Sequence, residues 1–400
     1  MPWRPLLQGA RAAGAEAAIA RLSTKGSRRR QGLEGPGLGL GAAGIALMHA
    51  YVGRLREDAA AMRRARRSLN GALRALERQE LNGTLSNGLP GIAWVMAHLD
   101  REGLVEADQG LAADLDRSLL GAVRGKRWKG ELDLLSGLVG FGAVALERLP
   151  RPDAWRTLER VVHHLGATAE RAGAGMAWPS HDWTTGERVY YLGVAHGVAG
   201  VIGFLARMVE LGVSPRPSRR LLDAAVALLL DQELPEGVSS RFPLALVPGK
   251  AGEPCRSAWC HGDLGIATQL LLAARMVREP AWERVAIRVA RDVAARPFEA
   301  DRDPEPALCH GSLGTAHLLN RMYQATGDAP LRRGALRRLE HGLQMWRAAQ
   351  SGGQPYHHQG KRGLLLGDAG MALALLAATT AVEPGWDRWM SVSTTPTSTM

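Results

Sequence analysis

Five side chains that could bind a metal or transfer a proton lie just before glycines of a repeated motif. They stand one to four residues before the motif glycine in four consecutive copies, as Asp133, His196, Cys260, Cys309 and His310. Because a repeat fold places equivalent positions on the same face, we expect these side chains to converge at one end of a central cavity.

Cys260, Cys309 and His310 form a donor set that suits zinc, since thiolates and imidazole are among its preferred ligands. Three protein ligands leave a fourth tetrahedral position open, as in catalytic zinc sites. The alternative is two buried cysteines and a core histidine, because free cysteine is among the most buried residue types. Their shared position in the repeats favours the zinc interpretation.

The repeated motif is Gly-x-x-Gly followed by a small or apolar run. Its seven copies begin at Gly41, Gly88, Gly137, Gly197, Gly262, Gly311 and Gly367. Each period has room for an all-apolar helix, as in 92–97, and an amphipathic one, as in 331–347. The pattern predicts an all-α fold, an α/α toroid of seven hairpins with seven inner and seven outer helices. An open solenoid of the same hairpins is the alternative. Two inserts, 176–191 and 236–259, are expected to form loops or short hairpins.

Composition and charge argue against two classes of protein, disordered chains and all-β folds. Apolar residues at 46% and charged residues at 22% exclude a disordered chain, and 5% aromatics argue against an all-β fold. The net charge of +11 is uneven, because residues 1–30 hold seven Arg or Lys and one Glu. We expect 1–30 to be a basic, flexible extension, with a mitochondrial presequence as the alternative. A single toroid at 31–385 and a polar tail at 386–400 should follow, and no nucleic-acid partner is expected.

The chain has three cysteines, which is too few for a disulfide framework, and an odd number cannot all be paired. We therefore expect a reducing, cytoplasmic location. The apolar run at 369–382 is shorter than the roughly 20 residues of a membrane span. We therefore expect a protein that does not span the membrane.

The motifs around these residues resemble those of the lanthionine synthetase C-like (LanC) family, the cyclases of lantibiotic biosynthesis. The resemblance runs from about 37 to about 378 and rests on Asp133-Leu-Leu-Ser-Gly137, His196-Gly197, Trp259-Cys260-His261-Gly262 and Leu308-Cys309-His310-Gly311. It implies the seven-hairpin toroid and zinc bound by Cys260, Cys309 and His310. It also implies His196 and Asp133 as acid/base residues, and it places the family's arginine at Arg256.

The resemblance implies a cyclase of the carbon–sulfur lyase class. Such an enzyme adds a peptide cysteine thiol to dehydroalanine or dehydrobutyrine in the same peptide, which closes a (methyl)lanthionine ring. His196 would protonate the α-carbon, Asp133 would orient His196, and Arg256 would stabilise the enolate or pair with Asp133. The expected partners are a dehydrated precursor peptide, a separate dehydratase and an exporter, since the chain has no room for a fused dehydratase.

Three features depart from the family pattern. His261 stands where the family often has Tyr, so it is either a hydrogen-bond partner of a ligand or an alternative ligand. Cys255 is out of repeat register and is expected to be structural. His357 and His358 precede the last apolar helix, where they either line the cavity rim or lie in a solvated loop.

Three other functions compete with the peptide cyclase. A LanC-like protein that adds glutathione to dehydrated residues would share every motif. A non-catalytic, zinc-containing peptide-binding scaffold would not need the acid/base pair. An α/α-barrel glycoside hydrolase needs two opposed carboxylates, and only Asp133 occupies a suitable position.

Overall fold

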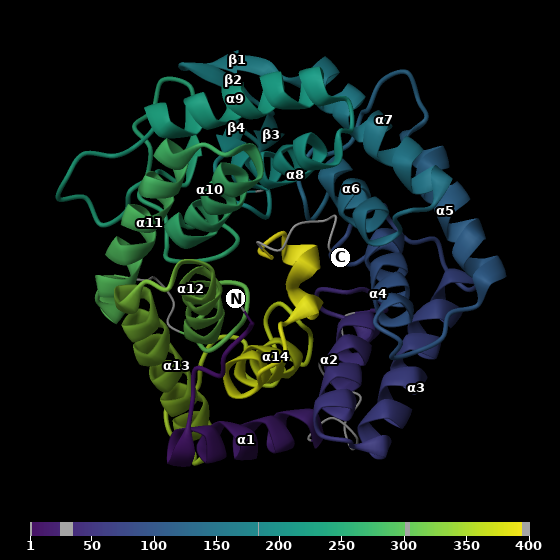
Figure 1. Ribbon diagram of the computed structural model, residues 1–400, viewed down its shortest axis with the longest axis vertical. Helices are drawn as coiled ribbons and strands as arrows, with labels where there is room; N and C mark the ends of the chain where they lie inside the picture. The colour runs from purple at the N-terminus through teal and green to yellow at the C-terminus, as the bar shows by residue number, and fades with distance from the viewer. Residues whose placement is uncertain (1, 25–34, 183, 301–304, 394–400) are drawn as a thin grey trace. The chain divides into compact units, whose positions relative to one another are not determined.

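The computed structural model describes residues 2–24, 35–182, 184–300 and 305–393 (Figure 1). The chain divides into two compact units. The first unit is formed by Met1–Gln109 and Ala294–Trp386, and the second by Gly110–Val293 and Asp387–Met400. Each unit therefore combines segments that are far apart in the sequence.

Fourteen α-helices lie in the described residues. Those of the first unit are α1 (Gly9–Thr24), α2 (Ala42–Leu55), α3 (Ala59–Leu76), α4 (Leu89–Arg101), α12 (Ser312–Thr326), α13 (Ala329–Gln350) and α14 (Asp368–Thr379). Those of the second unit, two of which reach its boundary, are α5 (Gln109–Val123), α6 (Leu138–Glu147), α7 (Pro152–Thr168), α8 (Val198–Leu211), α9 (Pro215–Asp231), α10 (Asp263–Val277) and α11 (Pro280–Ala295). None of the described helices is long and apolar enough to cross a membrane.

Seven of these helices begin directly after the first glycine of a Gly-x-x-Gly motif, and that glycine is their N-cap: α2, α4, α6, α8, α10, α12 and α14. They are buried on nearly all sides, as α10 is from Asp263 to Ala274. Helices between the motifs bury one face, as α3 does with Ala61, Ala65 and Leu69. The predicted alternation of apolar and amphipathic helices is confirmed.

The motif glycines are required because the preceding loop curls back over the start of the helix. A Cβ atom at Gly311 would overlap the carbonyl oxygen of Glu305, and one at Gly314 would overlap that of Leu308. In both cases the carbonyl belongs to the residue six positions earlier. The same loop supplies an acceptor for a helix N-terminal donor, since the Ser312 N–H donates to the Glu305 carbonyl at 2.8 Å.

Backbone hydrogen bonds join neighbouring repeats at the position two residues before the first glycine. In the second unit the Leu135 N–H donates to the Ala195 carbonyl, and the Ala195 N–H to the Cys260 carbonyl, both at 3.1 Å. In the first unit the chain of donors and acceptors is Cys309 to Leu365 at 2.9 Å, Leu365 to Gly39 at 2.8 Å and Gly39 to Ser86 at 2.6 Å. Within each unit, equivalent loop positions therefore lie side by side.

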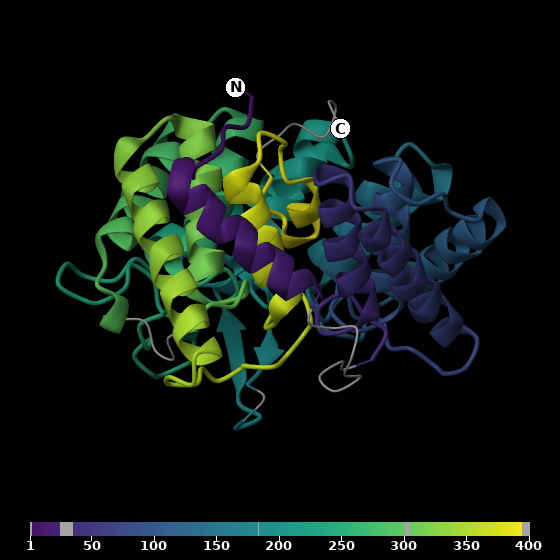
Figure 2. The same cartoon turned by 90° about the horizontal axis from the view of Figure 1, so that it is seen from below.

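The second unit also contains short strands, in the region where the sequence predicted loops or short hairpins. Strands β1 (Glu170–Ala172) and β2 (Gly175–Ala177) pair antiparallel, and β4 (Arg188–Tyr191) pairs with both β3 (Ser180–His181) and β5 (Ala245–Leu246). Its register sets Val189 opposite Ser180 and Tyr191 opposite Ala245. The β3–β4 hairpin extends beyond the ends of the helices (Figure 2). Strand β4 leads directly into the loop that carries His196.

The N-terminal segment is not the flexible extension that its charge suggested. Residues 9–24 form helix α1, which packs against α14 through a buried face of Ala15, Ala18, Ile19 and Leu22 (Figure 1). Before it, the Trp3 Nε1–H donates to the Ala377 carbonyl at 2.9 Å. The prediction is wrong here because the buried residues recur at helical spacing between the arginines. Residues 25–30 lie outside the described part.

The predicted polar tail at 386–400 is also wrong for its first half. Trp389 is fully buried and packs edge-to-face on Trp259, whose Nε1–H donates to the Met390 carbonyl at 3.0 Å. The Gln269 side chain donates to the Ser391 carbonyl at 2.9 Å. This segment therefore belongs to the core of the second unit, and 394–400 lie outside the described residues.

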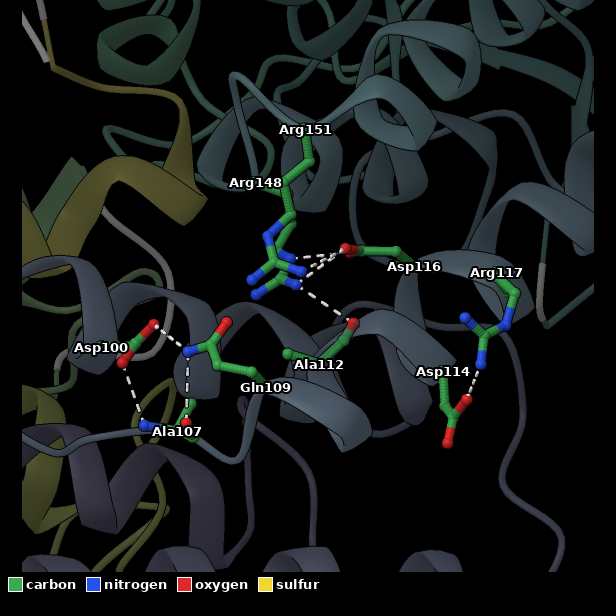
Figure 3. A network of polar contacts seen from close by, with 9 residues as sticks. All are labelled: Asp100, Ala107, Gln109, Ala112, Asp114, Asp116, Arg117, Arg148 and Arg151. Carbon is green, nitrogen blue, oxygen red and sulfur yellow. Dashed lines mark hydrogen bonds and ion pairs between the residues drawn. The ribbon is translucent and has the colours of Figure 1, made fainter.

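A buried ion pair joins α5 to the end of α6 (Figure 3). Arg148, the C-cap residue of α6, donates to both carboxylate oxygens of Asp116 at 2.7 and 2.8 Å and to the Ala112 carbonyl at 3.1 Å. Arg151 reaches the same carboxylate at 3.3 Å. Because the loop before α6 carries Asp133, this pair helps to fix the helix that supports that residue.

Candidate functional site

Asp133 and His196 form a hydrogen-bonded pair in the second unit. The Asp133 Oδ2 atom lies 3.0 Å from His196 Nδ1, and Oδ1 accepts the Ser136 N–H at 2.6 Å. The Asp133 side chain is 6% exposed and the His196 side chain 21%. Asp133 thus holds one nitrogen of the imidazole, and the backbone bond between Leu135 and Ala195 brings their two loops together. The pairing that we predicted is present.

The Asp133 carboxylate changes the acidity of His196. Burial alone would lower the pKa of His196, but the hydrogen bond and the charge of Asp133 outweigh it and raise that pKa above its ordinary value. An imidazole in this setting stays protonated to higher pH than a free one. It can therefore donate a proton near neutral pH.

His261 lies in a row of rings beside this pair. Its ring stacks on His196 with centroids 5.4 Å apart, and it meets Tyr191 edge-to-face at 5.1 Å. Burial lowers the pKa of His261 to about 4, so this imidazole is neutral at physiological pH. The Tyr191 hydroxyl donates to Asp182 at 3.0 Å. His261 therefore packs between His196 and Tyr191, and the sequence analysis did not identify Tyr191 as a neighbour of this pair.

A small, solvent-open hollow adjoins the Asp133–His196 pair. Its walls include Trp178, which lies between β2 and β3, Ser180 of β3, and Glu131 from the loop before α6. The Ser180 hydroxyl donates to Glu131 at 3.1 Å, which links the insert to that loop. The insert thus forms part of the wall of the hollow beside His196. The tryptophan and the turn were visible in the sequence, but their position was not.

Arg256 and Cys260 lie in the loop before α10. The Arg256 carbonyl accepts the Asp263 N–H at 2.9 Å, and the Arg256 charge acts on His261, where it contributes to the lowered pKa. Cys260 is 9% exposed and stands beside Ala195 in the backbone ladder. The predicted Asp133–Arg256 ion pair stays a prediction.

Cys255 belongs to a different network from Cys260. Its thiol donates to the fully buried Asp263 carboxylate at 3.2 Å. The same carboxylate accepts the backbone N–H groups of Arg241 and Phe242 at 2.9 and 3.0 Å. These contacts support the structural role that we expected for Cys255.

Cys309 and His310 lie in the loop before α12, in the first unit. Cys309 is 8% exposed and not in a disulfide, and its N–H donates to the Leu365 carbonyl. His310 Nε2 faces the carboxylate of Glu305 at 2.7 Å, and His358 Nδ1 faces its other oxygen at 2.7 Å. Burial alone would raise the pKa of Glu305, but its two histidines outweigh this and lower it. His358 therefore contacts a buried carboxylate.

The donor set fits zinc by its chemistry. Cys260 and Cys309 are both buried and neither is in a disulfide, and His310 keeps 17% of its side chain exposed. Two thiols and an imidazole are ligands that zinc prefers. Cys260 belongs to the second unit and the other two belong to the first, so the joint site stays a prediction.

Comparison with known proteins identifies the family. The family model of the lanthionine synthetase C-like proteins matches residues 33–390. The chain belongs to this family. The chain is similar in structure to nisin cyclase, with a TM-score of 0.77 at 18% sequence identity, over 95% of this chain and 97% of that one. The comparison with curated proteins gave no match. The match to nisin cyclase confirms the predicted fold class, an all-α toroid of the LanC type.

Proposed function

We propose that the protein is a zinc-dependent peptide cyclase that closes (methyl)lanthionine rings. The observation that carries this proposal is the Asp133–His196 pair, whose loop is bonded to the loop of Cys260 within one unit. Membership of the LanC-like family and likeness to nisin cyclase agree with it. The substrate class would be a peptide with a cysteine and a dehydrated serine or threonine.

Zinc would be held by Cys260, Cys309 and His310. Support comes from the shared position of the two cysteines, each two residues before the N-cap glycine of an apolar helix. When bound, zinc lowers the pKa of a coordinated thiol so that a substrate cysteine is available as the thiolate. No feature of the fold requires cysteine there, since Ala195 and Leu365 occupy the same position in other repeats.

The chain's own residues would complete the addition. The substrate sulfur forms a bond to the β-carbon, and the electrons of the carbon–carbon double bond move to an enolate. His196 then gives its proton to the α-carbon, which neutralises the enolate and leaves a thioether. Asp133 holds His196 Nδ1, so Nε2 is the nitrogen left to donate. Arg256 would offset the enolate charge.

The dehydrated residue must come from an enzyme that removes water from serine or threonine. The protein would act in the cytoplasm on a peptide that a separate dehydratase has dehydrated, and it would work together with an exporter. If glutathione is the nucleophile instead, the same residues would act and the product would gain the mass of the thiol. That difference separates the two candidates by mass spectrometry.

Ring closure can be measured as loss of thiol alkylation in a dehydrated, cysteine-containing peptide, because cyclisation leaves the mass unchanged. His196→Ala should keep zinc and lose about 10²–10⁴-fold in rate, the usual contribution of a proton donor. His163→Ala, at an exposed position of α7, is the control. Zinc loss from His196→Ala, or wild-type ring closure by it, would remove His196 from this role.

The ligand set has its own measurement, the zinc content of the purified protein. Cys309→Ala and Cys260→Ala should lose zinc, whereas Cys255→Ala should retain it because its thiol contacts Asp263. Full zinc retention in Cys309→Ala would defeat the assignment.

A further inference from the structure

A groove lies between helices α1 and α13, within the first unit (Figure 1). It encloses about 300 Å³, and its interior is lined by leucines that are almost fully buried, Leu7, Leu339 and Leu343. The exposed Ala10 of α1 stands on one wall. The groove therefore has room for a large apolar side chain from another molecule.

Charged side chains edge this groove. Arg347 lies against the backbone of α1, since a Cβ atom at Gly14 would come within 2.6 Å of the Arg347 Nη2 atom. Its guanidinium has no carboxylate partner among the described residues. Arg11 and Glu340 form an exposed ion pair at 3.0 Å, so the one anion at this edge is already compensated. Arg347 is left to pair with a carboxylate that enters from outside.

The surface around the groove is strongly basic. The amphipathic helices of the first unit, α1, α3 and α13, hold twelve arginines and two acidic residues, Glu16 and Glu340. Both glutamates are already in ion pairs, with Arg56 and Arg11. By contrast, α5, α7, α9 and α11 of the second unit hold nine arginines and eight acidic residues. Among the amphipathic helices the excess positive charge therefore lies on the first unit, where it attracts an acidic partner.

The groove faces away from helix α12 and from the loop before it. On α13, His341 Nδ1 lies 2.9 Å from the Ser312 hydroxyl, so this side of the helix is directed at α12. At about 3.6 residues per turn, Leu343 and Arg347 lie on the opposite side of α13. A molecule in the groove would therefore be separated by α13 from the loop of 309–310, and it would not need to enter the candidate site.

We propose that the groove binds a segment of a partner protein that presents a large apolar side chain flanked by carboxylates. The apolar side chain would enter the groove against Leu339 and Leu343, and a carboxylate would pair with Arg347. This proposal goes beyond the proposed function, because it requires neither zinc nor ring closure.

The groove does not suit the two other common anionic partners. A membrane surface is bound by apolar side chains that protrude from the protein. The exposed large apolar residues of the described part are Val238 and Val382, and neither lies on α1 or α13. Single-stranded nucleic acid stacks its bases on aromatic rings, whereas no aromatic residue lines this groove. A polypeptide carries both the apolar side chain and the carboxylates in one chain.

Peptide binding to the full chain, measured by fluorescence anisotropy, is the test. The probe is a short fluorescent peptide in which leucines stand between glutamates. Ala10→Trp places a ring in the groove from an exposed position, and it should weaken binding about 10–100-fold, the usual contribution of one buried apolar side chain. Ala13→Trp, exposed on the same helix but outside the groove, should bind like the wild type. Peptides with serine for leucine, or with glutamine for glutamate, should bind less tightly than the probe.

Charge reversal supplies a second, independent variant. Arg347→Glu should weaken binding of the probe about fivefold, and added salt should weaken binding by the wild type. The matched control is Arg216→Glu, at an exposed position of α9 in the second unit, which should leave binding unchanged. Circular dichroism checks that each variant is folded.

Four results would overturn the proposal. They are no binding of the probe by the wild type, equal binding by folded Ala10→Trp and Ala13→Trp, and binding of phosphatidylserine vesicles or oligothymidylate that Ala10→Trp abolishes. The fourth is slower ring closure by Ala10→Trp, which would assign the groove to the peptide substrate instead of a partner protein. If the wild type closes no ring but binds the probe through the groove, the proposed function fails and this proposal stands.

Discussion

Replacing Asp133 by Asn should shift the pH dependence of ring closure to lower pH. The carboxylate is 6% exposed and lies 3.0 Å from His196 Nδ1. An Asn oxygen can still accept the Ser136 N–H, so the loop keeps its turn. The charge that raises the pKa of His196 is lost, and burial, which lowers that pKa, remains. His196 in the variant should therefore titrate below its ordinary value of 6.5.

The sign follows from the protonated form being the donor. In the wild type the raised pKa keeps the donor protonated to higher pH, and the donor declines as the pH rises through that pKa. In Asp133→Asn it is already depleted at pH 7.5. Each unit of fall in the pKa removes about tenfold of the donor above that pKa. We expect ring closure at pH 7.5 to slow by about tenfold for each unit by which the pKa falls, with a smaller loss at pH 6, within the 10²–10⁴-fold limit of proton transfer.

Asp133→Asn should also lower the free energy of unfolding, and more at low pH than at high pH. A pKa raised by folding contributes stability that is complete below the unfolded pKa and is lost as pH rises through the folded pKa. A hydrogen bond to a charged group is worth about 1.5–3 kcal/mol, so urea denaturation of the zinc-free protein should show that loss at pH 6 and less at pH 9.

The assay is the alkylation measurement at five or more pH values, with Asp114→Asn as the control because that side chain is 64% exposed. Zinc content must match the wild type. A rate loss that is the same at every pH would refute the reasoning, because Asp133 would then act without changing the protonation of His196.

Three further outcomes are expected. The rate losses of Asp133→Asn and Arg256→Ala should be strongly non-additive in the double variant if the two form an ion pair, and a product of the single losses would show independence. Asp116→Ala strands a buried arginine and should cost about 3–5 kcal/mol in urea denaturation without removing zinc. Gly314→Ala has no room for its methyl group and should destabilise by about 1–3 kcal/mol, whereas Gly71→Ala, in open space on α3, should stabilise by about 0.5–1 kcal/mol.

The repeat could be predicted because its glycines are demanded by sterics. A backbone carbonyl lies so close to Gly311, and another so close to Gly314, that a side chain does not fit at either position. The same steric constraint recurs in each repeat, so the Gly-x-x-Gly pattern recurs in the sequence. The all-apolar helices could also be predicted from the sequence, because a helix that is buried on all sides contains almost no charged residues. Fold class, hairpin count and the equivalence of Cys260 and Cys309 all followed from these two constraints.

The two ends of the chain could not be assigned in the same way. Helix α1 lacks a Gly-x-x-Gly motif, and its buried face has only two large apolar residues, Ile19 and Leu22, beside two alanines and a serine, which gives a weak periodic signal beside the arginines. The segment after α14 is buried by two tryptophans, Trp386 and Trp389, in a short 3₁₀ helix without helical periodicity. Both ends are fixed by partners distant in sequence, such as Ala377 and Trp259, and a local pattern does not reveal such partners.

In the loops before the apolar helices, the residues that build the turn differ from the residues whose side chains could take part in chemistry. Their glycines and carbonyls build the turn, so the side chains at the remaining positions are free to differ between repeats. At six residues before the glycine the two cysteine loops carry opposite charges, Arg256 and Glu305. The candidate residues stood one to four positions before the glycine, so His310 was among them and Glu305, whose carboxylate lies 2.7 Å from His310 Nε2, was not.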